Sequence, residues 1–315
     1  MYLSYYHLKE EPFRLTPDPK FLQLAEPHRE ALTRLVQGVV ERRGLMVLSG
    51  PVGTGKTTIL NGVLNVLSRR ESLHPLPTAL LVNPRLTRDE LLEMLLFEFQ
   101  VSCVSTSRPA RLAALQELLF TTFTKGGTCL LIVDEAHLLS EDLLEEVRLL
   151  MNTESYREKL LQVVLCGQPE LTHLLNAPKV LALRQRIADR AVLRALSQSE
   201  MRMYIRERLR VAGFEQPVPF TTSSLDKIFA CTGGVPRLIN VVCDTCLLIG
   251  SETNRTEIGD DIVEEAAARH ELPMGIDHAV GIGLDLRSNR TQVEVAPPEL
   301  LARSIAAKAT GQGEL

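Results

Sequence analysis

Residues 45–58 read LMVLSGPVGTGKTT, and this stretch decides the fold. An apolar run ends at Ser49, a glycine-rich turn follows, and residues 58–70 then have the pattern of a helix. The turn, residues 50–57, matches G-x-x-x-x-G-K-[ST], in which backbone N–H groups and the start of a helix cradle phosphate groups. The stretch therefore predicts an α/β protein that binds a nucleotide at this turn.

Each position of the turn has a predicted part in holding ATP and Mg²⁺. Lys56 is expected to reach the β and γ phosphates, and Thr57 is expected to ligate Mg²⁺. The other residues expected to bind the nucleotide are Gly50, Pro51, Val52, Gly53, Thr54, Gly55 and Thr58. A glycine-rich turn without a ligand is the alternative, and the fit to a strand, a loop and a helix makes it the weaker interpretation.

A second apolar run, residues 129–133, leads directly into Asp134 and Glu135. An Asp at the carboxyl end of a buried strand can hold Mg²⁺. The adjacent Glu can orient and polarise the attacking water, and a protein that only binds and releases a nucleotide does not need it. The pair therefore favours ATP hydrolysis, and a slow nucleotide-dependent switch stays open as an alternative.

Five short β-type runs alternate with helix-length segments. The runs are residues 45–50, 78–83, 129–134, 161–167 and 190–196. Four of them are almost continuously apolar, as expected for parallel strands that are covered on both faces. Alternating strands and helices favour a five-stranded parallel sheet, and the four helices that follow without a strand predict a small all-α lid domain.

These patterns divide the chain into four expected parts. They are a strap with a helix that belongs to the ATPase module, the α/β nucleotide-binding domain, the helical lid domain and a polar tail, at residues 1–43, 44–196, 197–270 and 271–315. The strap contains Phe13, Pro17 and Phe21 and is expected either to pack against adenine or to cover the sheet edge. The tail is expected to be disordered or to form a weak strand pair at 279–286 and 291–295.

The composition indicates a globular cytoplasmic protein, with the periphery of the inner membrane as an open second location. The chain has 315 residues and a net charge of −4, so no general basic field attracts nucleic acid. DNA binding would therefore need a local patch. Residues 184–210 hold eight arginines and three acids, and most of these arginines are expected to lie on a solvated helical face. No secretion signal and no transmembrane segment are expected. Cys243 and Cys246 have C-x-x-C spacing, but core packing is favoured over redox or zinc chemistry.

The letters DEAH at residues 134–137 occur after a buried strand in two classes of protein, a group of helicases and the AAA+ ATPases. Such a helicase needs a second α/β domain with an arginine-rich motif, whereas the segment after residue 195 is helical and too short for one. No Ser-Ala-Thr motif follows His137. The architecture therefore favours the AAA+ class.

Three further positions agree with an AAA+ protein. Gln168 ends an apolar run where these ATPases place sensor 1, a polar residue near the γ-phosphate, although a strand-ending turn explains Gln168 equally well. Arg186, with Arg184 as the second choice, lies where these proteins present an arginine to the nucleotide of a neighbouring subunit. Arg237, in GGVPR, resembles sensor 2, whose arginine contacts the phosphates of its own subunit.

Six ordered segments closely resemble the ExeA or general secretion pathway protein A family of AAA+ ATPases. They are EPFRLTPDPKFL, GPVGTGKTT, LLIVDEAHLL, VVLCGQPEL, LRQRI and TGGVPRLIN, within residues 1–265. Members of that family are associated with type II secretion, pilus-like systems and exopolysaccharide loci, and transposition regulators of the TniB and TnsC type share the core. ExeA continues into a membrane span and a peptidoglycan-binding domain that this sequence lacks.

The resemblance implies an ATPase that uses ATP and Mg²⁺ and assembles with copies of itself into a ring or a filament. It also implies a protein partner in a secretion or envelope system that is remodelled or assembled by the ring. A DNA-associated regulator of the transposition type is the alternative. Because the cell-wall module is missing, direct cell-wall anchoring is not expected.

Overall fold

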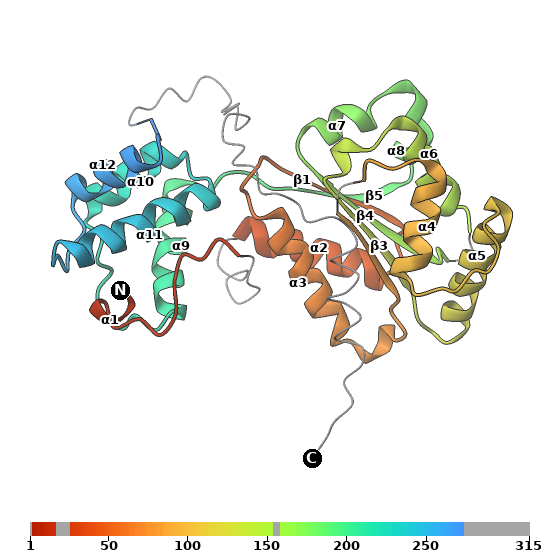
Figure 1. Ribbon diagram of the computed structural model, residues 1–315, viewed down its shortest axis with the longest axis horizontal. Helices are drawn as coiled ribbons and strands as arrows, with labels where there is room; N and C mark the ends of the chain where they lie inside the picture. The colour runs from red at the N-terminus through yellow and green to blue at the C-terminus, as the bar shows by residue number, and fades with distance from the viewer. Residues whose placement is uncertain (1, 17–25, 83, 154–157, 274–315) are drawn as a thin grey trace, which may run out of the picture. The chain divides into compact units, whose positions relative to one another are not determined.

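The computed structural model (Figure 1) describes residues 2–16, 26–82, 84–153 and 158–273. They belong to one compact unit, Met1–Ile276, and a second unit comprises Asp277–Leu315. Pro17, Phe21 and the tail with its predicted strand pair or disorder lie outside the described residues. All described helices and strands lie in the first unit.

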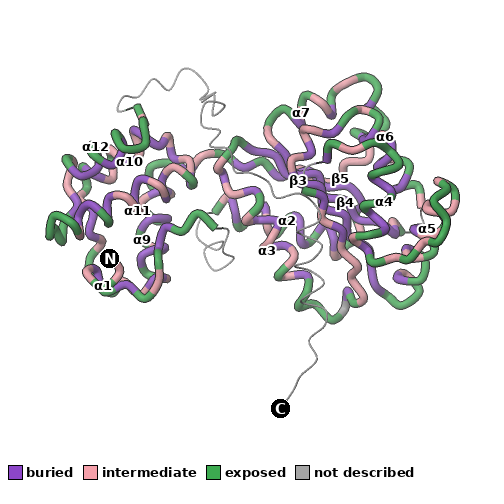
Figure 2. Tube along the Cα trace, viewed as in Figure 1, coloured by how far each residue is buried: buried purple, intermediate pink, exposed green. Residues whose placement is uncertain are grey.

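A five-stranded parallel sheet forms the centre of the nucleotide-binding part. Its strands are β1 (Leu45–Ser49), β2 (Thr78–Val82), β3 (Cys129–Asp134), β4 (Leu161–Gly167) and β5 (Ile187–Val192), in the order β2-β3-β4-β1-β5. Strands β1, β3 and β4 are buried along their whole length, which explains their continuous apolar sequences (Figure 2). The predicted five-stranded parallel sheet is confirmed, and its central strands bring three carboxyl ends together at one edge.

The fifth strand lies earlier in the chain than predicted. The sequence predicted a strand at 190–196, whereas β5 ends at Val192 and the N–H of Leu193 donates to the carbonyl of Ser49. The prediction was wrong because β5 is an edge strand, and most of its residues are partly exposed or exposed. An edge strand tolerates polar residues, and Asp189 interrupts the apolar pattern of β5 just before the predicted start at residue 190.

Helices cover both faces of the sheet (Figure 1). The helices and short 3₁₀ turns around it are α2 (Glu26–Val40), α3 (Lys56–Ser68), η2 (Glu71–Leu73), α4 (Arg88–Glu98), α5 (Arg108–Thr124), η3 (Ala136–Leu138), α6 (Glu141–Leu150), α7 (Glu170–Leu175), η4 (Pro178–Val180) and α8 (Leu181–Arg184). Alternate residues of β1 point to opposite faces, so Leu45 and Val47 pack with α4–α7 while Met46 and Leu48 pack with α2 and α3. The result is a three-layer α/β/α arrangement.

Four helices follow the sheet, as the sequence predicted. They are α9 (Gln198–Val211), α10 (Thr222–Thr232), α11 (Pro236–Glu252) and α12 (Asp260–Arg269). Ser197 and Glu200 form a capping box at the start of α9, in which each side chain bonds to a backbone N–H of the first turn. Among the described helices, none combines the length and the apolar character that a membrane crossing requires.

The N-terminal strap packs against these four helices. A short helix that the sequence analysis did not predict, α1 (Tyr2–Tyr5), precedes it, and the tyrosine at its start donates to Asp244 in α11. Phe13 is 1% exposed and belongs to the hydrophobic core of the helices. Phe13 therefore neither covers the sheet edge nor faces a nucleotide, and both expectations for this residue were wrong.

Candidate nucleotide-binding site

The loop between β1 and α3 needs its glycines. Gly53 and Gly55 have φ of +78° and +92°, in the left-handed region that favours glycine. A Cβ added to Gly50 would lie 2.8 Å from the carbonyl oxygen of Leu193, so a side chain there has no room. The local geometry thus requires glycine at Gly50 and Gly55, the two glycine positions of the motif, and also at Gly53, where the motif allows any residue.

A buried ammonium group lies over this loop. Lys56 is 7% exposed, and its Nζ donates to the carbonyl oxygens of Gly50 at 2.8 Å and Pro51 at 3.0 Å. Because these partners are neutral carbonyls of the loop itself, the charge of Lys56 has no carboxylate partner among the described residues in this position. The loop therefore presents a positive charge beside backbone N–H groups, which suits a phosphate group.

The two residues predicted to hold Mg²⁺ lie in contact. The hydroxyl of Thr57 donates to Oδ2 of Asp134 at 3.1 Å, and Oδ1 of the same carboxylate accepts from the N–H of Glu135 at 2.9 Å. One hydroxyl and one carboxylate fit Mg²⁺, which usually takes few protein ligands and completes its shell with water and substrate phosphates.

Glu135 and Gln168 lie beside the same imidazole. Nδ1 of His137 is 3.4 Å from Oε2 of Glu135, and its Nε2 is 3.2 Å from Nε2 of Gln168. Glu135 has φ of +52°, an unusual conformation for a residue with a side chain, and it lines the pocket together with Gln168. The sequence predicted no role for His137 beyond its place in the DEAH motif. In the structure, its ring lies between Glu135, the predicted catalytic carboxylate, and Gln168, the predicted sensor 1.

His28, in α2, is a site residue that the sequence analysis missed. Its Nε2 lies 2.7 Å from the carbonyl oxygen of Thr54, and a Cβ at Gly55 would come within 3.1 Å of the same nitrogen. Burial lowers the pKa of His28, so the neutral ring donates to this carbonyl through Nε2. No sequence spacing connects a helix before β1 with a loop after it, so only the fold could reveal this contact.

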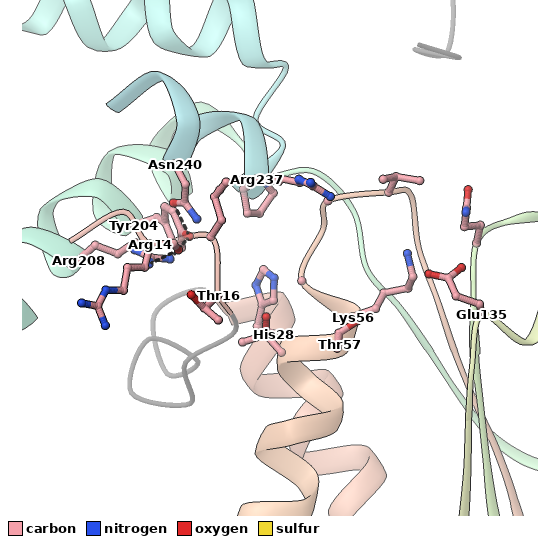
Figure 3. A pocket seen from close by; sticks show the side chains of 17 residues that line it. Arg14, Thr16, His28, Lys56, Thr57, Glu135, Tyr204, Arg208, Arg237 and Asn240 are labelled. Atoms are coloured by element: carbon pink, nitrogen blue, oxygen red, sulfur yellow. Dashed lines mark hydrogen bonds between the residues drawn. The ribbon is translucent and has the colours of Figure 1, made fainter. Parts of the chain in front are cut away.

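The pocket that contains these residues has a volume of about 370 Å³. Figure 3 shows Lys56 and Glu135 at one end, His28 and Arg237 between, and Tyr204 and Asn240 at the other end. The predicted site residues that line it are Val52, Gly53, Gly55, Lys56, Thr57, Thr58, Glu135, Gln168 and Arg237. Gly50, Pro51, Thr54 and Asp134 do not line it and act through the contacts described above.

Arg237 follows Pro236 in the first turn of α11 and contacts the phosphate-binding loop. Its N–H donates to the carbonyl oxygen of Gly53 at 3.1 Å, and a Cβ on that glycine would lie 3.0 Å from the arginine Cβ. The predicted sensor 2 arginine therefore lies next to the loop. The helix that carries it also carries Asn240, one turn further along.

Arg184 and Arg186 do not line this pocket. Arg184 is exposed at the end of α8, and the half-buried Arg186 lies between α8 and β5, where its Nη1 is 3.5 Å from the carbonyl oxygen of Arg148. The structure thus brings neither arginine to the nucleotide pocket of its own subunit.

Several arginines of residues 184–210 have partners within the chain. Arg194 pairs with Glu200 at 2.7 Å, and Arg208 is buried. Two further ion pairs join Arg202 to Asp226 and Arg210 to Glu207. Half of the eight arginines of this segment therefore have a partner or a buried position.

The two cysteines of the C-x-x-C segment are packed in the helical core. Cys243 and Cys246 are both fully buried in α11, and burial raises the pKa of each thiol. Both remain free thiols. This environment agrees with the favoured interpretation of core packing.

This chain is similar in sequence to an AAA domain family and to a secretion protein. Residues 39–175 match a family model described as an AAA domain. General secretion pathway protein A of Aeromonas hydrophila is 40% identical over 252 residues, which are 79% of this chain and 44% of that protein. The chain therefore spans less than half the length of this relative.

Two solved structures agree on the fold. Cdc6p from Pyrobaculum aerophilum has a TM-score of 0.63 at 19% identity and covers 87% of this chain and 73% of its own. The Drosophila ORC bound to DNA has a TM-score of 0.62 at 20% identity and covers 99% and 73% of the two chains. At such identities the likeness concerns the fold alone.

Proposed function

The chain belongs to the AAA+ family and is a relative of general secretion pathway protein A, and from this premise we propose that it binds and hydrolyses ATP with Mg²⁺. One observation carries the proposal: a single pocket edge combines Lys56, the contact between Thr57 and Asp134, and Glu135. Lys56 would bind the β and γ phosphates, and Thr57 and Asp134 would hold Mg²⁺. The bound ion would neutralise charge that develops on the phosphate oxygens.

The remaining residues would act on the water and on the γ-phosphate. Glu135 would accept a hydrogen bond from the attacking water and polarise it, with His137 beside the carboxylate to orient it. Gln168 would donate its amide to the γ-phosphate, and Arg237 would contact the phosphates of its own subunit. Arg186, or Arg184 as second choice, would reach the nucleotide of a neighbouring subunit in a homo-oligomeric ring or filament.

We further propose that hydrolysis remodels or assembles a protein partner of a secretion or envelope system. The support is the name and the identity of the relative from Aeromonas hydrophila, of which this chain covers 44%. The protein would work in the cytoplasm or at the periphery of the inner membrane. A DNA-associated regulator of the transposition type is the second candidate. Four of the eight arginines of residues 184–210 are paired or buried, which leaves fewer of them for DNA phosphates.

Lys56→Ala tests the nucleotide site. The variant should lose ATP binding, measured by titration calorimetry, because it removes the buried ammonium group that is proposed to bind the β and γ phosphates. Lys125→Ala, at an exposed position after α5, is the matched control and should bind normally. Affinity of Lys56→Ala within about threefold of wild type would contradict the assignment.

Two measurements separate the alternatives. Steady-state turnover of the wild type distinguishes a hydrolase from a slow switch. Binding to DNA in the presence of ATP, repeated over a range of salt concentrations, tests the second function, because phosphate contacts give a steep salt dependence. Steep, ATP-dependent DNA binding would overturn the order of the two functions.

A further inference from the structure

A chain of hydrogen bonds with a fixed direction lies at the pocket end remote from Lys56. The guanidinium of Arg208 has donors only. Its Nη1 donates to the hydroxyl oxygen of Tyr204 at 2.7 Å, so that oxygen accepts. The Tyr204 O–H then donates to Oδ1 of Asn240 at 2.9 Å. In this arrangement Arg208 donates, the Tyr204 oxygen accepts and its proton is donated onward, and the Asn240 oxygen accepts.

The chain determines which end of the Asn240 amide is available to a ligand. Its oxygen is occupied by Tyr204, so its NH₂ group is directed elsewhere. Asn240 is 7% exposed and lines the pocket, and within the described residues no group accepts a hydrogen bond from its nitrogen. The pocket therefore receives a hydrogen-bond donor from Asn240, and not an acceptor.

The same arginine holds this end of the pocket rigid. Its Nε donates to the carbonyl oxygen of Pro12, and its Nη2 donates to that of Arg14 at 3.2 Å. Arg208 also lies over the Tyr204 ring, 5.4 Å from its centroid. Because the strap is bound here, the residues that follow, Leu15 and Thr16, line the pocket beside Asn240.

A nucleotide with its phosphates at Lys56 would direct its base toward Asn240. Figure 3 shows Asn240 and Tyr204 at the end opposite Lys56 and Glu135. The cavity of about 370 Å³ has the size of a small-ligand site. Adenine offers acceptors at its ring nitrogens N1, N3 and N7. Guanine shares the acceptors N3 and N7, but its N1 carries a proton and would oppose a donor, so a contact at N1 is the one that distinguishes the two bases.

We propose that Asn240 is a specificity-determining residue that reads the base: its amide N–H, oriented by Tyr204 and Arg208, donates to a ring nitrogen of adenine. This inference rests on the proposed function, because it takes the phosphate end of the pocket to be at Lys56. Tyr204 is a positioning residue, since it acts only through the amide that it orients.

The experiment measures binding of ATP and of 1-deaza-, 3-deaza- and 7-deaza-ATP, each of which replaces one ring nitrogen by C–H. Wild-type protein should bind one of the three analogues about tenfold more weakly than ATP, because the buried donor loses its acceptor. Asn240→Asp keeps the shape and removes the N–H donor. This variant should bind ATP about tenfold more weakly and should no longer distinguish ATP from that analogue.

Two further variants make the result specific. Tyr204→Phe keeps the ring but frees the amide to turn, so discrimination between ATP and the same analogue should fall while 2′-deoxy-ATP and ATP keep their ratio. Asn65→Asp is the same chemical change at an exposed position of α3 and should leave every affinity unchanged. Thermal unfolding of each variant confirms that it is folded.

Each outcome decides the question. An equal loss for ATP and all three analogues in Asn240→Asp would mean a structural role and would overturn the inference. If Asn240→Asp instead changes the ratio of the affinities for ATP and 2′-deoxy-ATP, Asn240 contacts the sugar, and this result would also overturn the inference. If wild type binds ATP and Lys56→Ala does not, while Asn240→Asp keeps the wild-type ratios, the inference fails and the proposed function stands. If wild type binds no ATP, the proposed function itself fails.

Discussion

Gly55→Ala should destabilise the fold through two separable costs. Gly55 has φ of +92°, and a left-handed conformation costs a residue with a Cβ about 1–2 kcal/mol. Alanine recovers about 0.4–1 kcal/mol because it also restricts the unfolded chain. The added Cβ would then lie 3.1 Å from Nε2 of His28, tighter than an ordinary contact, so the imidazole must move.

The second cost arises from this displacement. His28 Nε2 lies 2.7 Å from the carbonyl oxygen of Thr54, and such a hydrogen bond contributes about 0.5–1.5 kcal/mol net. Together the two costs lower the free energy of unfolding by about 1–3 kcal/mol. For a chain of this size each kcal/mol lowers the Tm by about 2–4 °C.

Gly126 supplies the matched control for the backbone cost. Its φ is +82°, and a Cβ built there has nothing within 4 Å. Gly126→Ala therefore carries the left-handed cost without a steric contact. The assay is chemical unfolding of Gly55→Ala, Gly126→Ala and His28→Ala, singly and combined, without nucleotide. In the His28→Ala background, Gly55→Ala should cost no more than Gly126→Ala.

The double-mutant cycle isolates the contact as a coupling of about 0.5–1.5 kcal/mol between Gly55→Ala and His28→Ala. Effects that add within about 0.3–0.5 kcal/mol would refute the argument from the Cβ contact. Equal destabilisation by Gly55→Ala and Gly126→Ala in the wild-type background would do the same.

Two predictions concern the chemistry. Glu135→Gln should keep ATP and Mg²⁺ bound but lower turnover by roughly 10² or more, the range expected for the loss of a positioned base; wild-type turnover would exclude Glu135 as the residue that polarises water. Arg186→Ala and Lys56→Ala should each be inactive alone and should recover partial ATPase activity when mixed, because some interfaces then join an intact loop to an intact arginine. Fluorescence energy transfer between labelled subunits must first demonstrate exchange. If the mixture stays inactive while Arg184→Ala with Lys56→Ala recovers, the arginine is Arg184; if neither recovers, the site is not shared between subunits.

The sequence predicted well those parts of the structure in which the local backbone conformation determines the residue type. The phosphate-binding loop needs left-handed glycines at Gly53 and Gly55, so its letters reflect its geometry directly. The buried strands were found because both of their faces are covered and their residues are almost all apolar, with Gln162 in β4 as a polar exception. Strand β5 was misplaced for the opposite reason, since an edge strand tolerates residues such as Asp189.

Contacts between segments that are far apart in sequence could not be predicted. His28 meets Thr54 across 26 positions, and Arg208 meets Pro12 across 196 positions. Neither pair has a spacing that a helix or strand period could reveal. Asn240 is different, because it follows Arg237 by three residues and residues three apart share one helix face. That spacing was a signal, and the sequence analysis did not use it.

The position of Arg237 and Asn240 on one helix links the two ends of the pocket. The N–H of Arg237 is bonded to Gly53 in the phosphate-binding loop, and Asn240 lies one turn along α11 toward the base end. An α-helix rises about 1.5 Å per residue and transmits a displacement at one end to the next turn. Loss of the γ-phosphate would remove a ligand of Arg237 but not the adenine that Asn240 holds. We therefore expect α11 to pivot at the adenine base, so that its first turn shifts when the γ-phosphate is lost. ATP hydrolysis would in this way displace the helical bundle. It would also displace the strap, which Arg208 binds to that bundle.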